Sequence, residues 1–187
     1  MLSDLDIHAA LTHGDIVVEP IDDLERRLQP SSLDVRLGHQ FLVPRRHRLE
    51  FIDPKVDSTG LWDEKDVEEG GYFVLHPGEF ILATTLEKVS LPASIAARVE
   101  GKSSVGRLGI LVHSTAGFID PGFVGQVTLE VFSVSSLPTR LYPGMPIGQL
   151  AFFRLDTPAE NIYDGKYAGQ SGPQASQYHR NWDGSSW

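Results

Sequence analysis

Short segments in which apolar and polar residues alternate dominate the chain between residues 31 and 155. Leu33, Val35 and Leu37 alternate with polar residues or glycine, and residues 126–130 alternate in the same way. A period of two is typical of a β-strand that buries one face. Further apolar runs predict strands at 16–18, 41–43, 72–75, 80–84, 95–99 and 147–153. Because many short strands are separated by turn residues, the pattern predicts a mainly β domain of the barrel or jelly-roll kind.

Two related sequences, LHPGEFI at 75–81 and LYPGMPI at 141–147, place a Pro-Gly pair before an apolar strand. Glycine after proline is typical of a type II turn, because the third position of that turn has a positive φ. The two copies predict related hairpins in one barrel and argue against a solenoid built of many repeats.

The clearest helical signal lies at the N-terminus. Ser3 can cap a helix with apolar residues at 5, 7 and 9–11, and Gly14 can end it. Residues 22–27 fit one further helical turn. Residues 53–71 are acidic and contain glycines and a proline, so we expect a surface excursion there.

The last segment, 156–187, differs in composition from the rest of the chain. Gly, Ser, Gln, Asn and Tyr dominate it, with little apolar periodicity. We expect a tail that is mobile without ligand, within a single domain spanning 1–187. Such a tail can close over a site as a lid and exclude water, and the alternative is a plain disordered terminus.

Charge and composition narrow the classes of function. The chain has 187 residues and a net charge of −9, which argues against general binding to nucleic acid. It has no cysteine, which excludes disulfides and zinc–thiolate sites and fits a reducing cytoplasm. No apolar run reaches membrane-spanning length, and the acidic first residues do not resemble a signal peptide. We therefore expect a cytoplasmic protein that does not bind membranes.

One stretch carries an excess of positive charge against this acidic background. Residues 98–107 contain three basic residues and one glutamate, a net charge of +2. Within it, residues 101–107 have the sequence GKSSVGR, in which two hydroxyls and two cations lie around flexible glycines. Backbone N–H groups, hydroxyls and a guanidinium together suit a phosphate chain. The alternative is a polar turn between strands.

Two better-known motifs do not fit this stretch. GKSS resembles the end of a Walker A loop, but Ala96 occupies the position of the first glycine. No Gly-x-Ser-x-Gly elbow is present, because Val105 occupies its last position. A serine nucleophile is therefore not expected.

Two acidic residues of the central stretch are candidates for chemistry. Asp120 precedes a Pro-Gly pair and so lies at a turn, where an aspartate is often structural. Glu130 shares one face of a predicted strand with Gln126 and Thr128. A glutamate on a concave face can act as a base and then as an acid, and the alternative is a strand glutamate that faces solvent.

No pattern predicts a metal bound by the protein. The seven histidines are scattered and lack metal-ligand spacing. The H-x-E…P-C-x-x-C signature is absent, which argues against a zinc deaminase. His113 lies in the central stretch, and we expect it to pack or to make a structural hydrogen bond.

Several segments, among them QPSSLDVRL and HSTAGFIDPGF, resemble the dCTP deaminase branch of the dUTPase-like superfamily. Segments that match the family occur in the family's order at 29–37, 75–80, 100–109, 113–123, 128–130, 143–150 and 166–170. The resemblance implies a dUTPase-like distorted β-barrel or jelly roll with a short N-terminal helix. It also implies a homotrimer whose active sites are shared between subunits.

The resemblance assigns roles to individual residues. Glu130 matches the glutamate that activates water for attack on cytosine C4. Ser103 and Arg107 match residues that support the water and the developing charge, and Asp120 matches an aspartate near the deoxyribose. Further nucleotide and phosphate contacts are implied for Lys102, Ser104, Val105, Gly106, Thr128, Leu129, Gln149, Tyr163, Lys166 and Gln170.

Ala116 and Gly117 distinguish two types within the family. Deaminases that release dUTP typically have a histidine where Gly117 stands, whereas the bifunctional, dUMP-forming type has Ala-Gly. The resemblance therefore implies a zinc-independent hydrolase that converts dCTP to dUMP, ammonia and pyrophosphate and supplies dUMP for thymidylate synthesis. Mg²⁺ is implied on the substrate's triphosphate, and dTTP is implied as an inhibitor.

Three alternatives stay open. A deaminase that stops at dUTP is disfavoured by Gly117. A plain dUTPase is disfavoured because the chain lacks the glycine-rich, arginine-bearing tail motif of that branch. A non-catalytic nucleotide sensor or structural jelly roll is disfavoured because Ser103, Arg107, Asp120 and Glu130 occur together.

Overall fold

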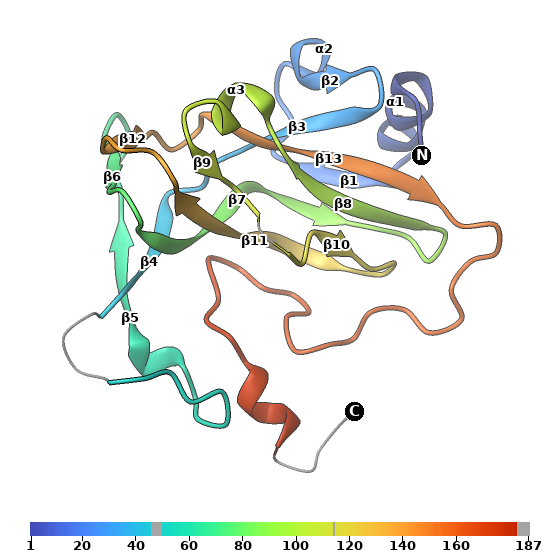
Figure 1. Ribbon diagram of the computed structural model, residues 1–187. Coiled ribbons are helices and arrows are strands. Elements are labelled where there is room, and N and C mark those ends of the chain that lie inside the picture. The colour runs from blue at the N-terminus through green and yellow to red at the C-terminus, as the bar shows by residue number, and fades with distance from the viewer. Residues whose placement is uncertain (46–49, 114, 183–187) are drawn as a thin grey trace.

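Two antiparallel β-sheets lie on either side of the core (Figure 1). The computed structural model describes residues 1–45, 50–113 and 115–182. The larger sheet has the strand order β5 (Trp62–Asp66), β4 (Gln40–Pro44), β7 (Phe80–Ser90), β11 (Val124–Ser133) and β9 (Ile110–Leu111), and β1 (Val17–Glu19) pairs with β7. The second sheet has the order β10 (Phe118–Ile119), β8 (Ile95–Gly101), β13 (Pro146–Arg154), β3 (Ser32–Arg36) and β2 (Leu28–Gln29).

The remaining elements are short. A third sheet pairs β6 (Phe73–Leu75) with β12 (Thr139–Leu141). The helices are α1 (Asp4–His13), α2 (Leu24–Arg27) and α3 (Ser103–Gly106), with 3₁₀ turns η1 (Thr59–Leu61) and η2 (Tyr178–Asn181). No helix in the described part of the chain is long and apolar enough to cross a membrane. The predicted mainly β fold is confirmed.

The apolar positions of the alternating strands build the core. On β11, Leu129 and Val131 are fully buried, whereas Thr128 and Glu130 alternate with them on the other face. Phe152 of β13 belongs to the same apolar cluster from the second sheet. Strand β11 therefore has one face fixed by packing and one face available for polar groups.

Helix α1 begins and ends as predicted. The Ser3 hydroxyl accepts a hydrogen bond from the Asp6 N–H at 3.2 Å, and the Asp6 carboxylate accepts one from the Ser3 N–H at 3.3 Å. These two bonds form a capping box. Gly14 ends the helix with a φ of +77°, a left-handed conformation that suits glycine.

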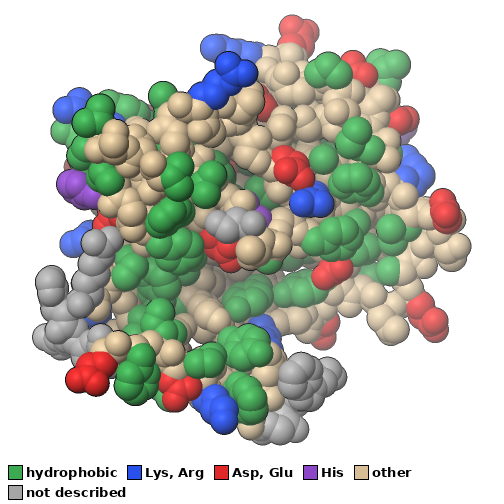
Figure 2. Space-filling view, in the orientation of Figure 1, with side chains coloured by type: hydrophobic (Ala, Val, Ile, Leu, Met, Phe, Trp, Pro, Cys, Tyr) green, Lys and Arg blue, Asp and Glu red, His purple; other side chains and the backbone are tan. Residues whose placement is uncertain are grey.

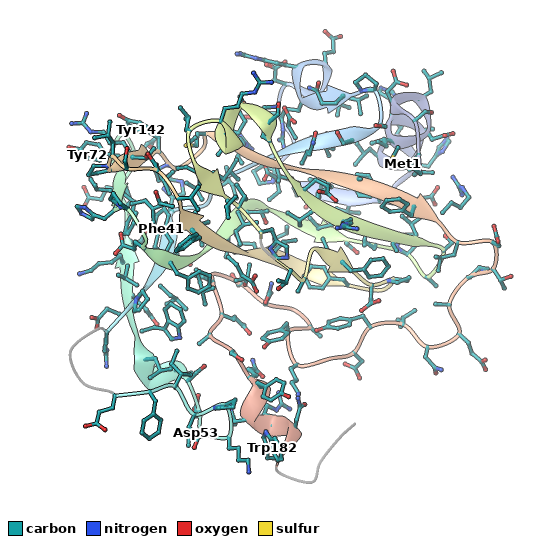
Figure 3. The ribbon with its side chains drawn as sticks, in the orientation of Figure 1. Met1, Phe41, Asp53, Tyr72, Tyr142 and Trp182 are labelled. Carbon is teal, nitrogen blue, oxygen red and sulfur yellow. The ribbon has the colours of Figure 1, made fainter. Side chains whose placement is uncertain are left out.

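Both Pro-Gly sequences form the predicted turns, but neither turn closes a hairpin. Gly78 and Gly144 have φ values of +70° and +82°. In each turn the N–H after the glycine donates to the carbonyl three residues earlier, at 3.0 and 3.1 Å. The prediction of hairpins is wrong because β6 and β12 pair with each other. Tyr72 and Tyr142 meet at this end of the molecule, with ring centroids 5.8 Å apart (Figure 3).

Strand β5 and helix α3 are among the elements that were not predicted. The 53–71 excursion includes β5, which pairs with β4 even though four of its five residues are charged and exposed. Pairing with β4 therefore orders this strand, although the sequence of β5 shows no alternation of apolar and polar residues. Helix α3 is a single turn inside the GKSSVGR sequence, whose glycines argued for a loop.

The C-terminal residues 156–182, here called the strap, cross the larger sheet without forming a strand (Figure 1). The Gln126 N–H donates to the Gln170 carbonyl at 3.0 Å, which ties the strap to β11. The Ser58 hydroxyl donates to the Ser176 carbonyl at 2.7 Å and ties the strap to the excursion before β5. Its mobility without ligand stays a prediction.

A buried carboxylate holds two arginines beside β3. The Glu87 side chain, which is fully buried, accepts from Arg27 Nη2 at 2.7 Å and from Arg36 Nε at 2.8 Å. Asp22 contacts the same two arginines at 3.4 and 2.9 Å, but its side chain is 67% exposed. Because a charge without a partner is costly only where water is excluded, the two carboxylates differ in importance.

We expect Glu87→Gln to lower the free energy of unfolding by about 3–5 kcal/mol, because two largely buried guanidinium groups lose their anion. Asp22→Asn is the matched control, since it removes a carboxylate from the same arginines where water can replace it. Urea unfolding followed by circular dichroism measures both. Equal midpoints for the two variants would contradict the importance of Glu87.

Candidate active site

The largest group of predicted site residues lines one cavity of about 480 Å³ between the strap and the sheets, here called the strap cavity. Figure 2 shows the surface hollowed between the body of the molecule and the strap. Strands β10 and β11, the segment before β10 and the strap itself all contribute to its walls. The predicted residues that line it are Ala116, Gly117, Asp120, Thr128, Glu130, Tyr163 and Gln170.

A second group lines a different pocket, of about 780 Å³, here called the loop pocket. It lies where the end of β8 and helix α3 meet β13 and β2 (Figure 1). The predicted residues that line it are Lys102, Ser103, Ser104, Gly106 and Gln149. His113 borders both pockets, so the segment around it separates them.

Four predicted residues line neither pocket. Val105 and Leu129 are buried in the core, so their side chains cannot reach a ligand. Arg107 is exposed at the end of α3. Lys166 is held within the strap by the side-chain oxygen of Asn181.

Glu130 presents its side chain from the middle of β11. It lies opposite Leu82 of β7, and the register of the two strands shifts between Gln126 and Thr128. A bulge of this kind re-aims the side chains next to it. No described residue forms an ion pair or a hydrogen bond with the Glu130 carboxylate, so its oxygens are open to a ligand or water in the cavity.

Asp120 lies at the predicted turn between β10 and β11. The Phe123 N–H donates to the Asp120 carbonyl at 3.2 Å, and Gly122 has a φ of +85°. The backbone of the turn is therefore fixed, while the exposed carboxylate faces the strap cavity. The arrangement places a second carboxylate in the same cavity as Glu130.

The backbone of Gly117 lies so close to β8 that a side chain does not fit. A Cβ atom there would lie 2.7 Å from the Val99 carbonyl oxygen and 3.2 Å from Cδ2 of His113. The Val99 N–H also donates to the Gly117 carbonyl at 2.8 Å. Glycine thus allows this segment to lie against β8 at the wall of the cavity.

The strap supplies aromatic and amide groups to the cavity. Tyr163 packs against Phe123 with ring centroids 5.9 Å apart, and burial raises the pKa of Tyr163, so its hydroxyl stays a donor. The Tyr167 N–H donates to the Tyr163 oxygen at 3.3 Å. The Gln170 side chain is buried, and its amide donates to the Gln126 carbonyl. Gln170 therefore fastens the strap as well as lining the cavity.

Several lining residues were not predicted. Tyr167 and Gln174 line the cavity from the strap, and Trp62 and Phe80 line it from the larger sheet. The spacing of Tyr163 and Tyr167 in a segment otherwise poor in apolar residues was the available signal for Tyr167. Trp62 had none, because it falls in the segment that was expected to be a surface excursion.

Among the described residues, neither pocket gathers a set of ligands for a protein-held metal. Within the described ranges, no group of three or more His, Asp or Glu side chains lies close enough together to hold a metal ion. The polar groups of the loop pocket are mainly an ammonium, hydroxyls and two amides, with the His113 imidazole at its border and Glu100 as an acidic exception. Such donors suit phosphate oxygens better than a bare cation.

Comparison with known proteins gives consistent matches. A family model described as dCTP deaminase-like matches residues 1–155. A relative named "dCTP deaminase, dUMP-forming" from Parafrankia sp. (strain EAN1pec) is 53% identical over 185 residues, which is 96% of this chain and 91% of the relative. A relative of the same name from Streptomyces coelicolor is 51% identical over 189 residues, which is 96% of this chain and 98% of the relative.

Solved structures agree in fold. A crystal structure of 2'-deoxycytidine 5'-triphosphate deaminase from Agrobacterium tumefaciens matches with a TM-score of 0.63 and 26% identity. The match covers 81% of this chain and 45% of that chain, so this chain spans less than half of the Agrobacterium protein. The dUTPase of phage 80α matches with a TM-score of 0.50 and 13% identity over 80% of this chain and 96% of that chain, which shows similarity of fold alone.

Proposed function

This chain belongs to the dCTP deaminase-like family, and from that premise we propose that it converts dCTP to dUMP, ammonia and pyrophosphate. The observation that carries the proposal is that Glu130, Asp120 and Gly117 line one cavity. Glu130 offers a base for the pyrimidine ring, Asp120 a carboxylate for the sugar end, and Gly117 a position without a side chain. A deaminase that stops at dUTP is disfavoured because Gly117 has no side chain and its segment lies against β8 at the wall of the cavity.

Deamination uses Glu130 first as a base and then as an acid. The carboxylate takes a proton from water, and the hydroxide adds to C4 of the cytosine. Glu130 passes this proton to N3 of the ring, then takes the proton of the new C4 hydroxyl and gives it to the amine, so that the C4–N bond breaks, ammonia departs and a carbonyl remains at C4. Backbone groups near Ala116 stabilise the charge that develops on the ring.

Cleavage of the triphosphate consumes a second water. The water adds to the α-phosphorus, and the bond from that phosphorus to the bridging oxygen breaks, so pyrophosphate leaves and dUMP remains. Because Gly117 allows its segment to lie close against β8, the segment leaves room for this water in the cavity. Asp120 orients the water or the deoxyribose beside it. The whole reaction uses two waters for each dCTP.

The loop pocket binds the phosphates. Lys102, Ser103 and Ser104 offer an ammonium and two hydroxyls, and Gln149 offers an amide. Mg²⁺ enters as part of the substrate, because it prefers phosphate oxygens and water to an all-protein cage. The strap lies over the strap cavity as a lid that excludes bulk water.

A homotrimer brings the two groups of residues together. Within one chain they line separate pockets, and Arg107 lines neither. We propose that the loop pocket of one subunit completes the strap cavity of the next, with Arg107 and Ser103 supporting the water held by Glu130. This arrangement assigns a use to Arg107, which its own chain leaves exposed.

The cellular setting follows from the proposed reaction. The enzyme works in the cytoplasm and supplies dUMP for thymidylate synthesis. dTTP shares the deoxyribose and the triphosphate with the substrate, so it competes for the same site as an inhibitor.

The first test is a product assay on Glu130→Gln. The wild-type protein with dCTP and Mg²⁺ should yield dUMP and pyrophosphate without accumulating dUTP, as separated by chromatography. Glu130→Gln should lower kcat by about 10²–10⁴-fold, because glutamine cannot shuttle protons. Calorimetry should show that it still binds dCTP, and Glu25→Gln on α2 is the control. An unchanged rate in Glu130→Gln would overturn the assignment.

The second test concerns the product that is released. Gly117→His places atoms where Val99 and His113 already lie, so the segment shifts and the space for the second water is lost. We expect dUTP to become the main product. Gly60→His is the control, because a Cβ at Gly60 meets nothing within 4 Å. If Gly117→His still released only dUMP, Gly117 would have no part in the second step.

The third test is complementation between subunits. Glu130→Gln and Arg107→Ala should each be nearly inactive alone. After joint unfolding and refolding at equal amounts, about a quarter of the sites should combine an intact Glu130 with an intact Arg107 from its neighbour. Recovered activity near that fraction supports shared sites. No recovery, in mixtures shown to contain hybrid oligomers, would place each site within one chain.

A further inference from the structure

Strand β3 presents a row of polar side chains behind the loop pocket. Ser32, Asp34 and Arg36 alternate along the strand with Leu33 and Val35, which are fully buried in the core. Each polar member holds a residue that is distant in sequence. The contacts are Ser32 Oγ to Gln149 Oε1 at 2.9 Å, Lys102 Nζ to Asp34 Oδ2 at 2.5 Å, and Arg36 Nε to Glu87 Oε1 at 2.8 Å.

The contact between Asp34 and Lys102 joins strand β3 to the loop pocket, which is the candidate phosphate site. The Asp34 side chain is only 9% exposed, and that of Lys102 is 28% exposed. The other oxygen of Asp34, Oδ1, is buried and has no hydrogen-bond partner among the described residues. Lys102 is therefore the group that balances this buried carboxylate.

Asp34 is itself held rigidly. Its backbone carbonyl accepts from Arg27 Nε at 3.1 Å and from Arg27 Nη2 at 2.8 Å. The same Nη2 donates to the buried Glu87 at 2.7 Å. The Asp34 carboxylate is therefore carried by a strand that is held on one side by buried Leu33 and Val35 and on the other by Arg27.

Lys102 in turn sets the start of helix α3. Its backbone carbonyl accepts from the N–H groups of Val105 and Gly106 at 2.9 and 3.0 Å. A fixed Lys102 therefore also fixes the turn that carries Ser103 and Ser104, which line the loop pocket. Figure 1 shows α3 close to β3 at this end of the molecule.

We infer that Asp34 is a positioning residue for the triphosphate site: it holds the Lys102 ammonium and the start of α3 in place before the phosphates arrive. The inference rests on the proposed function. A lysine side chain has many rotamers, and their loss on binding weakens affinity unless the side chain is ordered beforehand. A buried carboxylate on a rigid strand supplies that order.

A role for Asp34 as a competitor of the phosphates predicts a change in KM in the opposite direction. If Asp34 competed with the phosphates for Lys102, removing its charge would free the ammonium and strengthen substrate binding. The direction of the change in KM therefore separates positioning from competition.

The test is Asp34→Asn, which keeps the shape of the side chain and removes its charge. We expect KM for dCTP to rise roughly tenfold, the size typical when a supporting residue is lost, and kcat to change by less than about twofold. Inhibition by inorganic tripolyphosphate should weaken by the same factor, and inhibition by deoxycytidine should not change. An unchanged or lower KM would overturn the inference.

Asp63→Asn is the matched control. Asp63 also accepts from a basic side chain at 2.5 Å, that of Arg45, but both side chains are about half exposed and line neither the strap cavity nor the loop pocket. It should leave KM and the tripolyphosphate inhibition unchanged.

A double variant tests whether Asp34 acts through Lys102. In a Lys102→Met background, KM is already raised, and adding Asp34→Asn should raise it no further. A further rise would show that Asp34 acts by another route and would overturn the inference. Lys102→Met alone leaves the buried Asp34 carboxylate without its cation, so circular dichroism must show that this variant folds; the double variant buries no unpaired charge and still reports on KM if Asp34→Asn alone does not fold. Wild-type protein is assayed in parallel to separate the two proposals. If it does not convert dCTP, the proposed function is refuted. Binding of tripolyphosphate then still tests whether Asp34 positions Lys102.

Discussion

The burial of the apolar faces of β11 and β3 in the core is the constraint on which the candidate site depends. Leu129 and Val131 fix β11 in the core, and Glu130 between them can point only to the other side. Leu33 and Val35 fix Asp34 on β3 in the same way. Apolar packing on one face of these strands therefore fixes where their polar side chains lie, because a close-packed core allows little movement.

This constraint explains what the sequence could predict. Alternation along β3 and β11 identified both strands and the face on which Glu130 lies, and the caps of α1 and the two Pro-Gly turns depend on residues close together in the chain. The strand β5 could not be predicted in this way, because its charged residues show no alternation and its order comes from pairing with β4.

Some features of the candidate site could likewise not be predicted from the sequence. Spacing alone cannot show that residues 102–104 and Glu130 face different pockets, since that depends on how β8 and β11 are placed in two different sheets. The partnership of Lys102 with Asp34 was equally hidden, because 68 positions separate the two residues. The residues that the resemblance assigned to one site line two separate pockets in a single chain.

The absence of a side chain at Gly117 affects the neighbouring strand β8 as well as the cavity. Its backbone is pressed against the Val99 carbonyl, and the same two residues are joined by a hydrogen bond from the Val99 N–H. A larger residue at 117 must therefore disturb the edge of β8 as well as the cavity. An evolutionary path between proteins with and without a side chain here would be epistatic: a substitution at 117 displaces its segment unless a neighbour on β8 or near His113 has changed first.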